Sequence, residues 1–479
     1  MSRRSFRKNR VNEIVELTIE SIGFEGVAIA RHENIVHFVK KAVPGDVILA
    51  EIISKKSNFA EARIKEIITP SPLRQIPVCS HFGVCGGCSW QNLPITEQLR
   101  WKRQHVADCF ERIGKIPIGE LTETLASPRT LHYRNKMEFS FGASRWLTDA
   151  EMSESEEQMH KHFALGLHIP GRFDKVLDVD NCYIAHEISG RVLDEIRKQA
   201  LSLGVSAYNA RQHFGFLRNV IIRNTTATNE IMVVLLTSPP TTQADEHMIQ
   251  WIEQEFSVLF PEVTTLIHAI NRTTSPVAVG EPRTIKGSGF ITECVLDVEF
   301  RISPFSFFQT NPWQLEQFLS SILNATQLSR HETLWDLYCG TGSITLPASK
   351  LVSSSFGVEL SEGSIADARA NAERNSISTV QFFSEDLHKP AALSLLQTLP
   401  PPDVIIIDPP RAGVHQTLLS HILEVAPSRL VYVSCNPSTQ ARDCALLAEK
   451  YEIQKVQPVD MFPHTYHVES IAQLSLKQL

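Results

Sequence analysis

The sequence has no apolar run long enough to cross a membrane. Its longest uninterrupted apolar segments, such as residues 231–236, have the length of a single β-strand, whereas a membrane-spanning helix needs about 20 apolar residues. The first ten residues are basic and have no apolar core behind them, so a secretory signal is not expected. We therefore expect a cytoplasmic protein with no membrane partner.

The chain also lacks the excess of positive charge that generic nucleic-acid-binding proteins carry. Its formal net charge is −7, and its contents of 43% hydrophobic and 21% charged residues are those of an ordinary globular protein. The basic residues are unevenly distributed, because five of the first ten residues are Lys or Arg. A local basic patch is enough for RNA binding, so net charge does not exclude an RNA partner.

The Gly-x-Gly-x-x-Gly fingerprint of dinucleotide-binding enzymes is missing from the segment Asp336-Leu-Tyr-Cys-Gly-Thr-Gly342, which disfavours a nicotinamide enzyme. The two glycines still allow the backbone to approach a ligand. Acidic residues end this strand and the next two in the sequence, and Glu359 and Asp386 are placed to meet a ribose and an adenine edge. The series favours a nucleoside cofactor without phosphates, of which S-adenosylmethionine (SAM) is the obvious candidate.

A strict alternation of short apolar runs and helical segments begins at residue 303 and predicts a doubly wound α/β sheet. The expected helices lie at about 343–351, 363–375, 390–398, 414–425 and 438–450. The expected strands are Thr333–Tyr338, Ser355–Leu360, Val380–Phe383, Val404–Ile407 and Leu430–Val433, followed by a terminal pair at Ile453–Val459 and Val468–Leu476.

The segments before residue 303 predict further domains, as expected for 479 residues. Residues 1–12 read as a basic disordered arm. Residues 13–70 contain five strand candidates, at 16–22, 26–30, 35–39, 46–52 and 60–67, and predict a small OB-like β-barrel. Residues 71–302 read as a central α+β domain that carries a cluster of cysteines and is expected to bind RNA, with a helix at about 95–113 expected to pack on the C-terminal domain. The fold class is therefore multidomain α/β.

Three of the nine cysteines lie within ten residues, in the motif Cys79-x5-Cys85-Gly-Gly-Cys88. In a cytosolic chain such clustering indicates a metal centre or catalysis and not disulfides. Cys182 is the best candidate for a fourth ligand. Four thiolates suit zinc as well as an Fe–S cluster. The spacing differs from the Cys-x3-Cys-x2-Cys of radical-SAM enzymes and argues against that class.

Cys435 follows the apolar run Leu430–Val433 and precedes Pro437, which ends the strand. In a parallel α/β sheet, ligands bind beyond the carboxyl ends of the strands. The thiol is therefore a candidate nucleophile, although a lone cysteine is more often a small buried hydrophobe. The segments around it decide between the two interpretations.

Six motifs together resemble the RNA uracil-C5 methyltransferases. They are Cys79-x5-Cys85-Gly-Gly-Cys88-x-Trp-Gln91, Phe308-Gln-Thr-Asn311, Asp336-Leu-Tyr-Cys-Gly-Thr-Gly342, Ile407-Asp-Pro-Pro-Arg411, Val433-Ser-Cys-Asn-Pro437 and Phe462-Pro-His-Thr-x-His-Val-Glu469. The stretch Val43-Pro-Gly-Asp-Val-Ile48 looks like part of a TRAM domain, an RNA-binding barrel. With the cysteine motif, it makes the chain most similar to the 23S rRNA 5-methyluridine enzymes.

The resemblance implies a Rossmann-like class I methyltransferase domain over residues 303–479. It implies a [4Fe–4S] cluster on the four cysteines Cys79, Cys85, Cys88 and Cys182. It implies SAM contacts from Gln309, Tyr338, Glu359, Asp386 and Asp408. Ser343 stands where relatives often carry Asn after the glycine motif, so no contact is assigned to it.

The chemistry of the implied reaction explains why a thiol is required. Carbon 5 of uracil is a poor nucleophile, and addition of the Cys435 thiolate to C6 makes an enolate that attacks the methyl donor through C5. A general base must then remove the C5 proton, and Glu469 is the candidate by resemblance. Asp408 is placed to hold the uracil edge, and His464 and His467 are expected to be structural. We expect the target uridine to be flipped out of its stack.

Several alternatives stay open from the sequence. The same reaction on tRNA differs only in the substrate, whereas cytosine-C5 enzymes resemble one another in a second cysteine after the fourth strand, where this chain has Asp408-Pro-Pro-Arg411. Amino-group methyltransferases usually have an aromatic residue at the position of Arg411. A non-catalytic RNA-binding Fe–S protein would not be expected to retain Cys435 and Glu469. We expect a monomer with no obligatory protein partner.

Overall fold

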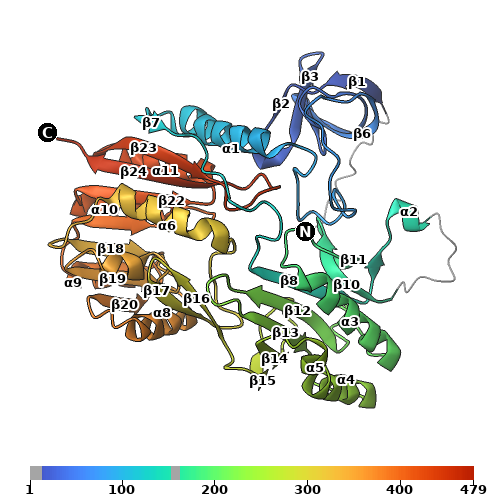
Figure 1. The fold of residues 1–479 in the computed structure, drawn as a ribbon. Coiled ribbons are helices and arrows are strands. Elements are labelled where there is room, and N and C mark those ends of the chain that lie inside the picture. The colour runs from blue at the N-terminus through green and yellow to red at the C-terminus, as the bar shows by residue number, and fades with distance from the viewer. Residues whose placement is uncertain (1–12, 153–161, 479) are drawn as a thin grey trace, which may run out of the picture.

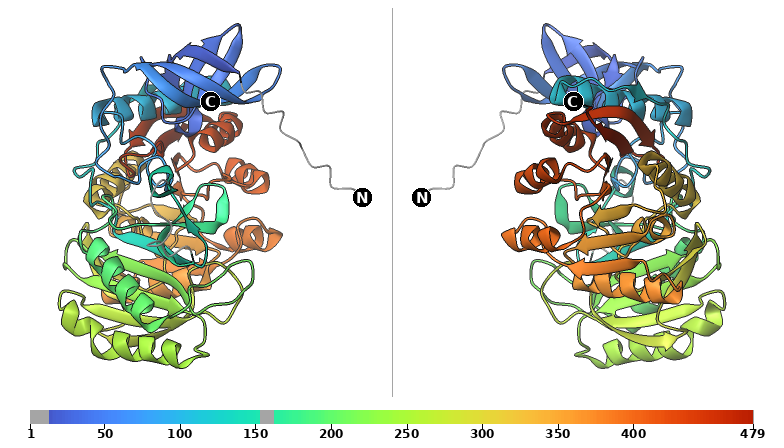
Figure 2. Two further views of the ribbon diagram at one scale, coloured as in Figure 1. Left: turned by 90° about the vertical axis from the view of Figure 1, so that its right-hand side faces the viewer. Right: turned by 90° about the vertical axis from the view of Figure 1, so that its left-hand side faces the viewer.

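A computed structural model describes residues 13–152 and 162–478, arranged in three sheet-based parts (Figure 1). The basic arm predicted for residues 1–12 lies outside the described residues. Within the described ranges, no helix combines the length and apolar character that a membrane crossing requires. Figure 2 shows the N-terminal sheet at one end of the molecule and the central domain at the other.

The N-terminal part is a six-stranded sheet with the order β1-β5-β6-β4-β3-β2. Its strands are β1 (Ile14–Thr18), β2 (Ser21–Ile22), β3 (Ala28–His32), β4 (Ile35–Val39), β5 (Val47–Lys55) and β6 (Phe59–Thr69), with a 3₁₀ turn η1 (Phe24–Gly26). Alternate side chains, such as Leu17, Ala30 and Ile48, form its core. Whether the sheet is the OB-like barrel predicted from the sequence stays a prediction.

The strand predicted over residues 16–22 is wrong, because it divides into β1 and β2. β1 pairs with β5, whereas β2 pairs with β3. At the switch, the Ile19 N–H donates to the Asp46 carbonyl (2.9 Å) and the Ile19 carbonyl accepts from the Gly45 N–H (2.8 Å). Between β1 and β2 the chain therefore forms hydrogen bonds with the turn that precedes β5, and that turn is distant in sequence.

The central part is built on an eight-stranded sheet with the order β15-β14-β13-β12-β8-β10-β11-β9. The helices α3 (Ile188–Leu203), α4 (Gln243–Gln254) and α5 (Phe256–Leu259) contribute to one core with the sheet, and a short helix α2 (Asp149–Met152) lies at its edge (Figure 1). The strands are β8 (Lys136–Gly142), β9 (Arg145–Trp146), β10 (Ala164–Ile169), β11 (Arg172–Asp178), β12 (Leu217–Asn224), β13 (Ile231–Thr237), β14 (Thr265–Ile270) and β15 (Glu281–Lys286). A hairpin, β16 (Ile291–Val295) and β17 (Val298–Ile302), leads to the C-terminal part.

The C-terminal part is the doubly wound α/β sheet that the alternation predicted, with the order β20-β19-β18-β21-β22-β24-β23-β7. Its strands are β18 (Thr333–Leu337), β19 (Ser354–Glu359), β20 (Val380–Ser384), β21 (Val404–Ile407), β22 (Arg429–Ser434), β23 (Tyr451–Val459) and β24 (Glu469–Leu476). Its helices are α6 (Pro312–Thr326), α7 (Thr345–Ser349), α8 (Glu362–Arg374), α9 (Pro390–Thr398), α10 (Gln416–Val425) and α11 (Pro437–Leu447). The multidomain α/β class and the methyltransferase-type sheet are confirmed.

An earlier segment of the chain completes this sheet. The helix α1 (Ile95–Cys109), continued by the π-turn η2 (Phe110–Gly114), packs against α11 and β23. The strand β7 (Glu120–Leu121) pairs in parallel with β23 at the sheet edge (Figure 1). Lys102 of α1 is fully buried and donates to the Asp460 carboxylate at 2.5 Å. The N-terminal half of the chain therefore contributes to the C-terminal core.

Candidate active site

The carboxyl ends of five neighbouring strands bring the predicted site residues to one edge of the C-terminal sheet. Leu337 pairs with both Val358 and Ile407, so the residues that follow these positions, Tyr338, Glu359 and Asp408, lie side by side. The Asp408 N–H donates to the Leu337 carbonyl at 3.2 Å, which fixes its strand end against that of β18. Sheet register alone therefore gathers side chains that lie far apart in the sequence.

The same register places the proposed nucleophile beside the proposed base. β22 and β24 are antiparallel with Ser434 opposite Ser470, so Cys435, one residue past β22, lies opposite Glu469, the first residue of β24. Burial, with a smaller contribution from the Glu469 carboxyl, raises the pKa of the Cys435 thiol to about 11. The Arg411 guanidinium opposes this shift by its charge and a hydrogen bond. The two predicted catalytic residues thus share one microenvironment.

Burial raises the pKa of three carboxyl groups at this edge toward neutrality. Burial, helped by Asp408, raises the pKa of Glu469 to about 8. Burial also raises the pKa of Asp408 to about 7. Asp336, inside β18, has a pKa raised by burial to about 7, although Thr345 Oγ1 donates to it at 2.5 Å. Several acids that titrate near neutrality within one site are typical of a catalytic centre.

The loop after β18 has the features of a ligand cradle. Tyr338 adopts a left-handed backbone conformation, with φ of 70°, which is uncommon for a residue other than glycine. The Gly340 N–H donates to the Glu359 carboxylate at 3.3 Å. The Tyr338 hydroxyl is buried and has no hydrogen-bond partner among the described residues. An orphaned buried hydroxyl is costly, so a ligand that bonds to it fits this position.

Gln309 and Asp386 flank this cradle from two other segments. Gln309 is buried three residues before α6, and its carbonyl accepts from the Asn135 side chain at 3.0 Å. Asp386 follows β20 and accepts from the His388 N–H at 3.0 Å. That hydrogen bond is the main cause that lowers the pKa of Asp386. Burial raises the pKa of Tyr338, with smaller contributions from Asp443 and Asp386, so Asp386 lies near the same strand edge. The segment of Gln309 reaches the loop after β18 through the Thr341 hydroxyl, which donates to the Phe307 carbonyl at 3.5 Å.

Four cysteines distant in sequence line one cavity of about 420 Å³. They are Cys79, Cys85, Cys88 and Cys182. Burial raises the pKa of Cys88 to about 12, and the other three thiols add to the shift. Nevertheless, across residues 13–152 and 162–478 no group of three or more His, Cys, Asp or Glu side chains is arranged to hold a metal ion. The thiols share a cavity but are not drawn together as a coordination shell.

Sequence reasoning missed the part that Arg411 plays in this site. The guanidinium bonds to Cys435, and the Arg411 carbonyl accepts from the Asn436 side chain at 3.0 Å. The loops after β21 and β22 are thereby joined. The motif Asp408-Pro-Pro-Arg411 showed that a cation follows the fourth strand. Periodicity does not reveal which way the side chain of an arginine after two prolines points.

The segment between Asp460 and Glu469 is clamped by residues near the cysteine motif. The His464 carbonyl accepts from the Ser89 and Trp90 N–H groups, and the His464 N–H donates to Gln98 Oε1 at 2.8 Å. Burial lowers the pKa of both His464 and His467 to about 4. Both imidazoles are thus neutral at pH 7, in keeping with the structural role expected for them.

Comparison with known proteins agrees with this geometry. Residues 295–477 match the family model for tRNA (uracil-5-)-methyltransferases, and residues 8–65 match the TRAM domain. An uncharacterised RNA methyltransferase of Bacteroides thetaiotaomicron is 41% identical over 95% of this chain and 99% of its own length. Another, from Chlorobaculum tepidum, is 39% identical over 97% of this chain and 96% of its own length.

A solved structure is similar over almost the whole chain. The tRNA (uracil-54, C5)-methyltransferase of Pyrococcus abyssi, in complex with S-adenosyl-L-homocysteine, is 26% identical. The match has a TM-score of 0.73 and covers 96% of this chain and all of the other. The fold, the strand-edge site and these relatives together lead to one conclusion: the chain is an RNA methyltransferase of the SAM-dependent uracil-C5 family.

Proposed function

We propose that this protein transfers a methyl group to C5 of a uridine in RNA through a covalent adduct with Cys435. The observation that carries the proposal is the register of β22 and β24, which sets Cys435 opposite Glu469. Asp408 ends the neighbouring strand β21 and adds its carboxyl to the same edge. A nucleophile, a base and a group for the uracil edge are thus delivered by three adjacent strands.

The residues divide the reaction into addition, methylation and elimination. The Cys435 thiolate forms a bond to C6 of uracil, and the electrons of the C5–C6 double bond move to the O4 enolate. Bound SAM supplies the methyl group that C5 takes up. Glu469 then accepts the C5 proton, the C5–C6 double bond returns, and the bond from Cys435 to C6 breaks. The thiolate is regenerated, and Glu469, which now carries the C5 proton, must release it to solvent before the next turnover.

Both proposed catalytic groups must lose a proton before they act: Cys435 before it attacks C6, and Glu469 before it can accept the C5 proton. With a pKa of about 11 for Cys435 and about 8 for Glu469, both groups are protonated in the free protein at neutral pH. Arg411 is the nearby cation that favours the thiolate. We assign Arg411 the role of stabilising this thiolate, because an adjacent cation is a general means of lowering a cysteine pKa.

The five residues around the β18 edge are proposed to hold SAM. Glu359 at the end of β19 is placed to accept the ribose hydroxyls, and the unpartnered Tyr338 hydroxyl offers a polar contact. Gln309, Asp386 and Asp408 complete the set. This assignment predicts that Glu359→Ala weakens SAM binding about tenfold or more, since a charged hydrogen bond contributes ~1.5–3 kcal/mol.

The four thiols around the 420 Å³ cavity are proposed to hold a [4Fe–4S] cluster with a structural role. Thiolates in a set of four suit such a cluster. Burial raises the pKa values of the Cys79, Cys88 and Cys182 thiols, so metal binding must release protons. Anaerobically purified protein should contain iron and acid-labile sulfide and absorb visible light; zinc alone by elemental analysis would overturn the assignment.

The RNA proposed as substrate is 23S rRNA, because the TRAM match and the cysteine motif occur together in this chain. A tRNA substrate is the second candidate, favoured by the similarity to the Pyrococcus abyssi tRNA enzyme. Mapping 5-methyluridine in both RNAs, with the protein present and deleted, decides between them. Loss of one rRNA methyluridine supports the first, and loss confined to tRNA supports the second.

A further inference from the structure

Within residues 13–152 and 162–478, no element covers one part of a face of the central sheet. Ile221 of β12 and its partner Val234 of β13 belong to a core that also contains Phe318 and Val431 of the C-terminal part. Directly opposite Ile221, on β8, Glu138 instead lines a cavity of about 1090 Å³. The same sheet face is therefore covered by the catalytic domain over β12–β14 and hollowed over β8, β10 and β11. We call this hollow the sheet groove.

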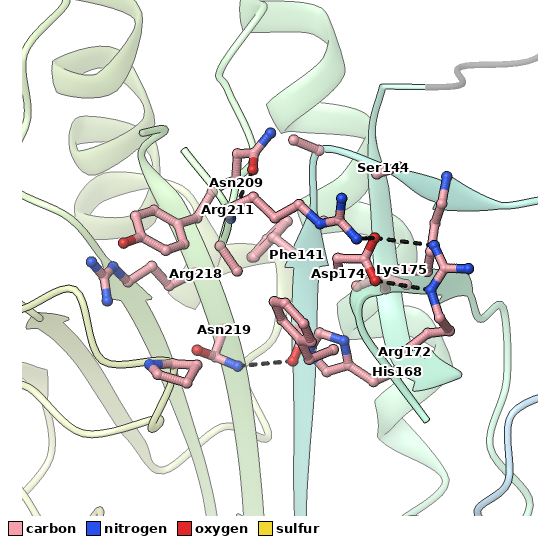
Figure 3. Close-up of a pocket in the computed structure, with 18 of the residues that line it drawn as sticks. Phe141, Ser144, His168, Arg172, Asp174, Lys175, Asn209, Arg211, Arg218 and Asn219 are labelled. Atoms are coloured by element: carbon pink, nitrogen blue, oxygen red, sulfur yellow. Dashed lines mark hydrogen bonds and ion pairs between the residues drawn. The ribbon is translucent and has the colours of Figure 1, made fainter. Parts of the chain in front are cut away.

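Among the described residues that line the sheet groove, cations outnumber anions. Arg172 and Arg211 converge on one carboxylate, that of Asp174, at 3.0 and 2.9 Å (Figure 3). The Arg172 contact holds the pKa of Asp174 down at about 2. One carboxylate is thus shared by two guanidinium groups, which leaves one positive charge uncompensated, and Lys175 adds another. This excess stands out on a chain of net charge −7.

The remaining charged groups of the groove are already engaged. Glu138 pairs with Lys136 at 2.7 Å. Arg218 donates to the Ser238 hydroxyl and to the Thr273 and Ser275 carbonyls, and it lies 3.9 Å from the ring centre of Tyr208. Arg218 therefore shapes the groove, whereas Arg172, Lys175 and Arg211 supply its free positive potential.

Two aromatic side chains are exposed on the turns that frame the groove. Phe173, between Arg172 and Asp174, is 66% exposed, and the Arg211 guanidinium lies 5.9 Å from its ring centre. Phe214, on the turn that carries Arg211, is 68% exposed. Exposed aromatic rings next to cations are the elements with which proteins bind single-stranded nucleic acid, because bases stack on the rings and phosphates meet the cations.

The sheet groove shares one lining residue with the cysteine cavity. Glu138 lines both the groove and the cysteine cavity. The cysteine cavity is in turn lined by Phe308 and Thr310, the neighbours of Gln309. The sheet groove therefore lies beside the cysteine cavity, which reaches the neighbours of Gln309.

We propose that the sheet groove binds a single-stranded RNA segment flanking the target uridine, with Phe173 as a stacking platform and Lys175 and Arg211 as phosphate contacts. The identification of the occupant rests on the proposed RNA substrate. The groove is a separate site from the catalytic edge, and it selects RNA whose flanks are unpaired.

The test measures binding of a fluorescein-labelled 12-nucleotide oligouridylate by fluorescence anisotropy over a salt series. We expect the double variant Lys175→Ala/Arg211→Ala to bind at least about tenfold more weakly at low salt. The slope of log affinity against log salt should fall by ~1.4, since each phosphate contact on a single strand contributes ~0.7. Phe173→Ala should weaken binding about tenfold with little change in this slope.

The matched control is Arg191→Ala/Lys198→Ala, which removes two exposed cations from α3, among the helices that pack on the sheet. It should bind the probe as the unmodified protein does. Equal affinity of the groove and control variants would overturn the proposal. SAM binding by calorimetry checks that each variant is folded.

A second measurement needs no variant. Photocrosslinking of the unmodified protein to a 4-thiouridine oligonucleotide should label peptides that contain residues 172–175 or 208–214, and labels confined to other segments would overturn the proposal. Neither measurement requires methyl transfer. Failure to find 5-methyluridine would therefore count against the proposed function and leave the groove standing, and the reverse also holds.

Discussion

At the scale of single residues, burial disfavours the thiolate form of Cys435, which is the form that the proposed reaction requires. Desolvation raises the pKa of Cys435 to about 11, and Arg411 is the nearby charge that opposes it. Arg411 itself is exposed, so it is free to meet the approaching RNA as well as the thiol. The Cys435 thiolate is thus expected to form when the RNA substrate binds and not in the free protein.

Replacing Cys435 should affect methyl transfer without affecting the binding of SAM. Cys435→Ala should reduce methyl transfer below detection, because no other thiol lies at this strand end. Its affinity for SAM should stay within about twofold, since the thiol is assigned no cofactor contact. Tritium transfer from labelled SAM and calorimetric titration measure the two quantities. Retained turnover would show that the reaction proceeds without a covalent adduct.

Removing the base should trap the intermediate. In Glu469→Gln the C5 proton has no acceptor, so elimination of the thiol stalls after methylation. We expect a protein–RNA band that survives a denaturing gel. The Cys435→Ala/Glu469→Gln double variant is its control and should show no such band. If Glu469→Gln turns over normally, another group removes the proton.

The raised pKa of Glu469 also predicts how stability depends on pH. The folded protein holds this proton up to pH of about 8, whereas an unfolded Glu loses it near ~4.3. The stabilising contribution is therefore present below pH ~4.3 and is lost as pH rises to about 8, with a slope of up to ~1.4 kcal/mol per pH unit. Urea unfolding between pH 5 and 8 should show a flatter dependence for Glu469→Gln than for the unmodified protein.

At the scale of elements, α1 is held to the catalytic domain by a buried ion pair. Lys102 and Asp460 are 0% and 1% exposed, and Lys102 also donates to the Phe462 carbonyl at 3.0 Å. Lys102→Met leaves the Asp460 carboxylate buried without its cation, which typically costs ~3–5 kcal/mol. Urea unfolding measures this loss. Arg100→Ala, on the exposed side of the same helix, should cost at most ~1 kcal/mol.

The strand pattern of the C-terminal sheet could be predicted because each buried parallel strand is a short apolar run between helices. The five predicted parallel strands agree with β18–β22 to within a residue or two. The break between β1 and β2 could not be predicted, because it depends on a hydrogen bond from Ile19 to the distant Asp46. The two-residue strand β7 is too short to leave a periodic signal.

The site residues likewise divide into those whose position could be predicted from the sequence and those whose position could not. Motifs at strand ends predicted that Cys435, Glu359 and Asp408 lie at the sheet edge, since chain position at the end of a strand implies position at that edge, and the register places them there. The contribution of Arg411 and the clamp on His464 arise from contacts between segments, which a single sequence does not encode locally. The sheet groove belongs to this second class, since Asp174 and Arg211 come from separate elements.

At the scale of the whole molecule, the catalytic domain is discontinuous in sequence. α1 and β7 precede the central domain, yet they pack on α11 and β23, close to the end of the chain. The three parts are therefore linked by more than their connecting peptides. A truncated protein limited to residues 303–479 would expose the edge of β23 and the face that α1 covers.

The early position of α1 has a consequence for synthesis on the ribosome. The apolar residues Val106 of α1 and Phe110 of η2 leave the exit tunnel long before β23 has been translated, and they share a core with Leu447 and Tyr451. The apolar face of α1 therefore stays exposed until nearly the whole chain has emerged, because its partners α11 and β23 are among the last elements translated. During that interval the nascent protein is a natural client for chaperones that shield hydrophobic helices.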